Sequence, residues 1–263
     1  MNEKTINRID SFFKILFNVY LALLILFAAV VLYFNFDTFK GNIEYGIGKV
    51  QSFLLSVEGK TQTMSDNDFN EIVSLCGASE EDRVLYSIKT GNTTMLSERE
   101  LQLYAVVKSF VDKQSGKSQF EIVKAVNDYI CKNTVYAHHL IDYNQAYDDS
   151  QTAYGSLVLG QTVCAGYSRA ANLLLNACQV EAIYVKGWVP GEDGGSHAWS
   201  MVKLDSDGEW FHLDVTWNDM DDEGSWNYDY FLKSDDWFAQ SRTWERWMYH
   251  ECPSSIIIDN NNN

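Results

Sequence analysis

Three short stretches decide the fold: TVCAGYS at residues 162–168, GSHAW at 195–199 and WFHLDVTW at 210–217. The first predicts the start of a core helix, because residues 164–178 are largely small or apolar. The other two predict neighbouring strands joined by the turn sequence DSDG at 205–208. A core helix followed by a hairpin favours the α+β class, with helices packed on an antiparallel sheet.

The turn also predicts the register of the hairpin. A four-residue loop at 205–208 places Leu204 opposite Glu209. His197 and Asp214 then become diagonal neighbours on one face of the sheet, within reach of each other's side chains. A loop longer or shorter by one residue would put them on opposite faces.

Cys164, His197 and Asp214 would supply a nucleophile, a base and an orienting acid, in that chain order. The thiolate is the reactive form of cysteine, and a free thiol has a pKa of about 8.5. At the start of its helix, Cys164 would meet unpaired amides and the positive end of the helix dipole, which stabilise an anion. Asp214 would accept from one nitrogen of His197 and hold the other nitrogen toward the thiol.

Each of these residues also has a structural interpretation. Alone, Cys164 is a small buried hydrophobic residue, His197 a hydrogen-bonded strand histidine, and Asp214 a cap or an ion-pair partner. His212 has the same strand parity as Asp214 and is the rival base. The catalytic interpretation rests on the joint occurrence of the ordered motifs.

The composition limits the class of partner. The chain has 263 residues and a net charge of −16, with 36 acidic and 20 basic side chains. Nucleic acid is therefore not an expected partner, since phosphate binding needs a basic face. The acidic surface favours cationic partners or serves solubility. A hydrophobic content of 46% predicts a packed core.

The N-terminal part predicts one membrane-spanning helix at residues 15–36, a stretch without a charged residue. A cleaved signal peptide and a buried core helix are the alternatives. Basic residues favour a cytoplasmic location for residues 1–14 and an extracytoplasmic location for the rest. The remaining chain divides into a linker at 37–64, one folded domain at 65–255 and a polar tail at 256–263.

The cysteine and histidine spacings do not indicate a metal centre. There are five cysteines and no C-x-x-C pair, so neither a zinc knuckle nor a thioredoxin motif is predicted. Four cysteines remain beside Cys164, and the sequence leaves open whether they form disulfides or stay reduced. A metal-dependent hydrolase that uses His138, His139, His197 and acidic residues has no recognised ligand spacing, and no cofactor is expected.

Further elements follow from local signals. Capping boxes at 97–100 and 118–121 precede apolar residues at helical spacing, which predicts two amphipathic helices. Residues 65–75 predict a short helix, residues 83–89 a strand and residues 181–189 another strand.

Over residues 120–237 the chain resembles the transglutaminase-like domain, a branch of the papain-like cysteine-enzyme fold. The motifs that carry the resemblance are NDYI at 127–130 before VY at 135–136, AYGSL at 153–157, VCAGYS at 163–168, SHAW at 196–199, HLDVTWND at 212–219 and YFLKSD at 230–235.

The resemblance implies Cys164 as nucleophile, His197 as base and Asp214 as orienter. It implies a thioester acyl-enzyme formed from an amide or peptide bond in a protein or peptide substrate, such as a cell-surface protein or cell-wall peptide. The Cys164 amide and the Tyr154 side chain are the candidate oxyanion donors, with core packing as the alternative role of Tyr154. The family also includes members without catalysis, so a surface binding or scaffold module is the second hypothesis. Some relatives bind calcium, but a solvated acidic turn explains residues 219–223 better.

Overall fold

The computed structural model describes residues 78–138, 149–191, 194–204, 208–219 and 225–258. The span predicted at 15–36, the linker at 37–64 and the short helix at 65–75 lie outside these ranges. Among the residues described, no helix combines the length and the apolar character that a membrane crossing requires. The described residues belong to one compact unit, Gly77–Asn263.

Three capped helices open the described part of the chain: α4 (Glu80–Thr90), α5 (Glu98–Val111) and α6 (Gln119–Asn133). A serine precedes each one, and its hydroxyl accepts from the third helical amide while the acidic side chain there accepts from the serine amide. The two helices predicted from capping boxes are therefore confirmed.

The strand predicted at residues 83–89 is wrong, because this segment lies within α4. The apolar residues of this segment favour a strand locally, but a capping box formed by Ser79 and Asp82 starts a helix. Gly91 ends that helix in the left-handed conformation, at a φ of 74°. Val84 and Ser87, three residues apart, form its buried face.

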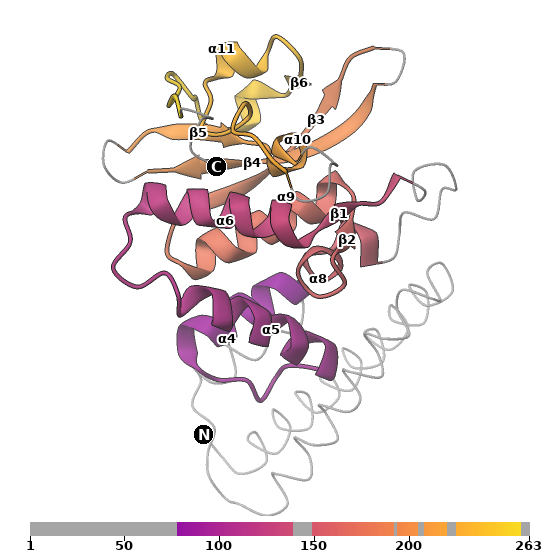
Figure 1. Cartoon of the computed structure of the whole chain (residues 1–263), viewed down its shortest axis with the longest axis vertical. Coiled ribbons are helices and arrows are strands. Elements are labelled where there is room, and N and C mark those ends of the chain that lie inside the picture. Colours follow the sequence, from indigo (N-terminus) through magenta and orange to yellow (C-terminus); the bar gives the residue numbers. More distant parts are fainter. Residues whose placement is uncertain (1–77, 139–148, 192–193, 205–207, 220–224, 259–263) are drawn as a thin grey trace, which may run out of the picture. The chain divides into compact units, whose positions relative to one another are not determined.

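A four-stranded antiparallel sheet lies on one side of α9 (Cys164–Ala177), with the strand order β5-β4-β3-β6 (Figure 1). Its strands are β3 (Ala182–Val189), β4 (Gly195–Lys203), β5 (Trp210–Leu213) and β6 (Thr243–Trp244). Helices α4 and α5 lie on the opposite side of α9. The predicted α+β arrangement of helices on an antiparallel sheet is confirmed.

Short elements complete the architecture. Strands β1 (Val135–Tyr136) and β2 (Gln161–Thr162) pair in parallel just before α9. The remaining short elements are η1 (Asp149–Gln151), α8 (Ala153–Leu157), α10 (Val215–Asn218), α11 (Asp235–Phe238) and η2 (Arg246–Met248).

The predicted hairpin register is confirmed, but the second strand is shorter than predicted. The Leu204 amide donates to the Glu209 carbonyl at 3.0 Å, and Ser200 pairs with Leu213. The strand predicted at 210–217 ends at Leu213, because the Asp214 side chain accepts from the Trp217 amide and caps α10.

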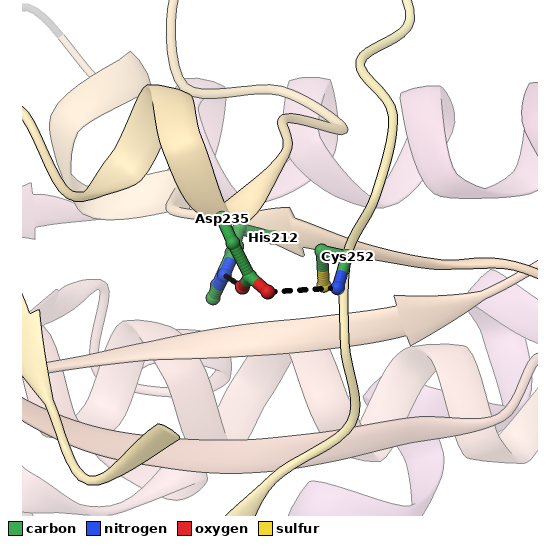
Figure 2. Close-up of side chains that lie close together, drawn as sticks. All are labelled: His212, Asp235 and Cys252. Carbon is green, nitrogen blue, oxygen red and sulfur yellow. Dashed lines mark hydrogen bonds and ion pairs between the residues drawn. The ribbon is translucent and has the colours of Figure 1, made fainter. Parts of the chain in front are cut away.

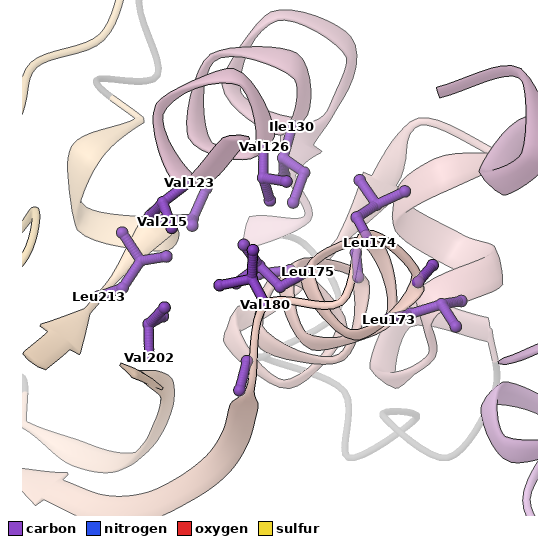
Figure 3. Close-up of a cluster of buried hydrophobic side chains, with 14 of the residues drawn as sticks. Val123, Val126, Ile130, Leu173, Leu174, Leu175, Val180, Val202, Leu213 and Val215 are labelled. Atoms are coloured by element: carbon purple, nitrogen blue, oxygen red, sulfur yellow. The ribbon is translucent and has the colours of Figure 1, made fainter. Parts of the chain in front are cut away.

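The core fixes α9 against the sheet. Figure 3 shows Val123, Val126 and Ile130 of α6 facing the same cluster as the leucines of α9 and the ends of β4 and β5. Burying one such side chain contributes roughly 1.5–3 kcal/mol. The first turn of α9 is thereby held in place relative to the β4–β5 hairpin.

The tight contacts of β3 with β4 and β6 give a first test of this packing. A Cβ added at Gly187 would lie 2.4 Å from the Thr243 carbonyl oxygen and 2.4 Å from the Trp199 ring. Gly187→Ala is therefore expected to lower the free energy of unfolding by about 1–3 kcal/mol in urea denaturation. Gly195→Ala is the control, because its Cβ would meet nothing within 4 Å. Equal stability of the two variants would contradict the packing described.

Candidate active site

Cys164 is the first residue of α9 and is partly exposed. No side chain caps the helix, because Val163 stands at the N-cap position. The first amides of α9 are therefore left for an anion at this end. The first turn of α9 packs closely against the segments before it, and only a glycine fits at position 166. A Cβ at Gly166 would lie 1.8 Å from the Thr162 hydroxyl oxygen and 2.8 Å from the Thr152 carbonyl oxygen.

His197 and Asp214 form a buried hydrogen-bonded pair. Nε2 of His197, in β4, lies 2.7 Å from Oδ2 of Asp214, the residue that follows β5. The two side chains are 7% and 0% exposed. The Cys164 side chain acts on the pKa of the same imidazole. Since Nε2 is engaged by Asp214, Nδ1 is the nitrogen left for the thiol.

Charge in this group favours the imidazolium form of His197. Burial alone would lower the pKa of His197, but the Asp214 carboxylate and then Cys164 outweigh it and raise the pKa to about 9. Burial would raise the pKa of Asp214, but His197 and then Arg242 act against it, and the pKa stays below its ordinary value. The pair therefore carries an imidazolium beside a carboxylate at neutral pH.

Arg242 is a buried side chain that holds Asp214 from the other side. Its Nε and Nη2 both donate to Oδ2 of Asp214, at 3.1 and 2.6 Å. The guanidinium carbon lies 4.3 Å from the ring centre of Trp217, 4.2 Å from that of Tyr230 and 4.9 Å from that of Phe238. Arg242 was not predicted from the sequence, since it lies 28 residues after Asp214 and outside every motif.

The phenol beside Cys164 belongs to Tyr136 rather than to Tyr154. Burial and then the charge of Cys164 raise the pKa of Tyr136, whose hydroxyl lies close enough to Cys164 to be affected by it. Pairing of Tyr136 with Thr162 brings it to the start of α9. The hydroxyl of Tyr154 donates instead to Gln102 of α5.

His212, the rival base, faces a different set of partners. It is fully buried, and its Nδ1 accepts from the indole N–H of Trp199 at 2.8 Å. Its Nε2 lies 2.8 Å from Oδ1 of Asp235. Figure 2 shows the two side chains facing each other. Burial lowers the pKa of His212, so the ring is neutral. Trp199 in turn stacks on His197, with ring centres 5.9 Å apart.

His212, Asp235 and Cys252 lie close enough together to hold a metal ion, with ligand atoms within 4.8 Å (Figure 2). The hydrogen bonds oppose this role. Because Nδ1 of His212 accepts from Trp199, the hydrogen of the neutral ring is on Nε2, the nitrogen that faces Asp235. A metal ligand needs an unprotonated nitrogen there. Asp235 also accepts from the Cys252 amide at 3.1 Å, so the group is explained as a hydrogen-bonded support for Trp199.

Other predicted positions are placed as follows. Cys131, Cys178 and Cys252 are free thiols, as is Cys164, while Cys76 lies outside the described residues. His138 is exposed, and His139 is not among the described residues.

Of the acidic turn at 219–223, only the first residue is described. The carboxylate of Asp219 accepts from the Tyr167 hydroxyl at 2.5 Å.

Comparison with known proteins identifies the domain. Residues 105–215 match the model of the transglutaminase-like superfamily, a segment that contains Cys164, His197 and Asp214. The matched segment is therefore a transglutaminase-like domain, and members of that superfamily are generally cysteine proteases or transglutaminases. No curated protein matches the chain.

Two solved structures are similar over part of their length. One is a candidate cysteine protease from Cytophaga hutchinsonii, at 18% identity and a TM-score of 0.35, over 43% of this chain and 37% of that one. The other is a TGase, at 19% identity and a TM-score of 0.31, over 64% of this chain and 37% of that one.

Proposed function

We propose that this protein is a cysteine enzyme that cleaves or transfers an amide or peptide bond through Cys164, His197 and Asp214. The observation that carries the proposal is the buried pair formed by His197 and Asp214, whose Nε2 and Oδ2 atoms lie 2.7 Å apart, with Cys164 among the groups that act on the same imidazole. A thiol, an imidazole and an orienting carboxylate in this order are the parts of a nucleophilic triad.

The chemical steps follow from this arrangement. The proton of Cys164 passes to His197, and the thiolate attacks the carbonyl carbon of the substrate. The carbonyl oxygen becomes an oxyanion, for which the Cys164 amide and the Tyr136 hydroxyl are the proposed donors. His197 then gives its proton to the leaving nitrogen, the carbon–nitrogen bond breaks, and ammonia or an amine leaves a thioester behind.

The thioester is resolved by water or by an amine. The attacking molecule gives a proton to His197 as it bonds to the carbonyl carbon, and the carbon–sulfur bond breaks. The sulfur of Cys164 then takes that proton back. Water yields hydrolysis, and an amine yields transfer; the acidic chain, with a net charge of −16, favours a cationic amine-bearing partner.

The proposed setting rests on the sequence alone. The uncharged residues 15–36 would anchor the protein in the cell membrane by a single helix, with the catalytic domain outside the cytoplasm. A protein or a cell-wall peptide at the cell surface would then be the substrate.

The test is a substrate screen with three readouts. The full chain, in mild detergent, is incubated with glutamine-containing peptides and a fluorescent primary amine, and with Cys164→Ala as the control. Ammonia release without amine incorporation marks deamidation, ammonia release with amine incorporation marks transfer, and new peptide N-termini mark proteolysis. We expect at least one product from the wild type and none from Cys164→Ala. Equal product formation by the two proteins would refute the proposal, and absence of any product would favour the binding module.

A further inference from the structure

We propose that Arg242 is a positioning residue that fixes the Asp214 carboxylate and shares its charge, so that His197 can release its proton to the leaving group. The inference rests on the proposed function and adds a fourth residue to the site. Arg242 acts through Asp214, and no step requires it to touch the substrate.

The geometry of the guanidinium supports this role. Two of its N–H groups converge on Oδ2 of Asp214, the same oxygen that His197 uses. The remaining oxygen, Oδ1, accepts from the Trp217 amide at 3.3 Å. With three side-chain donors and one amide, the carboxylate has little freedom to rotate, and the orientation of the His197 ring follows from it.

The burial of Arg242 points to a specific role rather than a surface ion pair. The Arg242 and Asp214 side chains are both 0% exposed. A buried cation is costly to desolvate unless it is paired and hydrogen-bonded. The faces of Trp217, Tyr230 and Phe238 surround the guanidinium and supply cation–π attraction.

The charges around His197 explain why a cation is useful here. Among the residues described, the charged and titratable groups near the imidazole are Asp214 after β5, Cys164 at the start of α9 with Tyr136 beside it, Arg242 behind the carboxylate, and the neutral His212 behind Trp199. If Asp214 interacted with His197 alone, its full negative charge would stabilise the imidazolium and raise the pKa of His197 further. Arg242 offsets that charge, which weakens the hold on the proton that His197 must donate.

The experiment separates charge from hydrogen bonding. Alkylation of Cys164 by limiting iodoacetamide is followed by intact mass from about pH 5 to about pH 10 in the full chain. The variants are Arg242→Gln, which keeps an N–H donor without the charge, and Arg242→Lys, which keeps the charge. Arg246→Met is the matched control, because Arg246 lies over the Trp244 ring and, within the described part of the chain, forms no hydrogen bond or ion pair with Asp214.

We expect the alkaline step of the rate profile, where His197 loses its proton, to move upward by about one pH unit in Arg242→Gln, a tenfold gain in proton affinity. Arg242→Lys and Arg246→Met should keep the wild-type step. An unmoved step in a folded Arg242→Gln protein, with only a lower melting temperature, would overturn the proposal.

Two further outcomes are also decisive. If Arg242→Gln does not fold, Arg242→Lys settles the matter, since a shifted alkaline step in the folded lysine variant contradicts a role for the charge. Failure of the proposed function gives a different signature. In that case the alkylation rate of the wild type rises with pH in a single step, as for a free thiol. Replacing His197 or Arg242 would not change that profile.

Discussion

Replacing Asp214 with alanine is expected to lower the free energy of unfolding by about 3–5 kcal/mol. The variant leaves Arg242 without its ion-pair partner in a fully buried position and leaves Nε2 of His197 without an acceptor. It also removes the cap that starts α10, since the Asp214 side chain accepts from the Trp217 amide. Urea denaturation followed by tryptophan fluorescence measures the change.

Two variants control this prediction. Asp236→Ala removes an exposed carboxylate on α11 and should change the free energy of unfolding by less than about 0.5 kcal/mol. Asp214→Asn keeps an oxygen acceptor and loses the charge, so it should lie between the wild type and Asp214→Ala. A stability of Asp214→Ala within the range of Asp236→Ala would show that the buried network contributes little.

The second large effect concerns His197. We expect His197→Ala to slow alkylation at Cys164 by roughly 30- to 100-fold at about pH 6. A free thiol is less than about 1% thiolate at this pH, and the proposed triad places an imidazolium beside the sulfur to speed the reaction. The lower intrinsic nucleophilicity of a stabilised thiolate offsets part of the gain. The rate constant is measured by intact mass under limiting iodoacetamide.

His250→Ala is the matched control for this variant. His250 is exposed and stacks on Trp210, with ring centres 4.1 Å apart. Its removal should leave the alkylation rate unchanged. A similar slowing in both histidine variants would mean that the rate reports a general loss of structure.

The His197–Asp214 contact could be predicted from the sequence because the turn is local. Gly208 adopts a φ of 73° in the turn, and the pairing of Leu204 with Glu209 follows from that turn. The pairing fixes which side chains share a face of the hairpin. The continuation of the second strand to Trp217 was wrong, because the capping preference of Asp214 outweighs the strand-forming residues after it.

Arg242 and Tyr136 could not be predicted by the same reasoning. Arg242 bonds Asp214 across 28 residues of sequence, and the aromatic rings around its guanidinium, Trp217 and Tyr230, come from separate segments. Tyr136 is placed by a pairing of two-residue strands, which is too short to have a periodic pattern. Both contacts depend on how distant segments meet, and a single sequence records no signal for that.

The same limit explains the expectation about Tyr154. This residue lies in a motif close to Cys164 in the chain, but its hydroxyl bonds Gln102 and its ring lies 3.7 Å from the Arg99 guanidinium carbon. A short helix, α8, carries it, and its N-cap is Thr152. Closeness in sequence therefore did not predict that Tyr136, rather than Tyr154, lies beside the Cys164 thiol.

The most direct test of the central claim is the pH–rate profile of Cys164 alkylation in the wild-type chain from about pH 5 to about pH 9, with Cys164→Ala to identify the labelled residue. An activated pair predicts that Cys164 reacts rapidly at about pH 6, well below the region where a free thiol ionises, and that His197→Ala abolishes this reactivity. A slow reaction that rises only near pH ~8.5, unchanged in His197→Ala, would contradict the catalytic account.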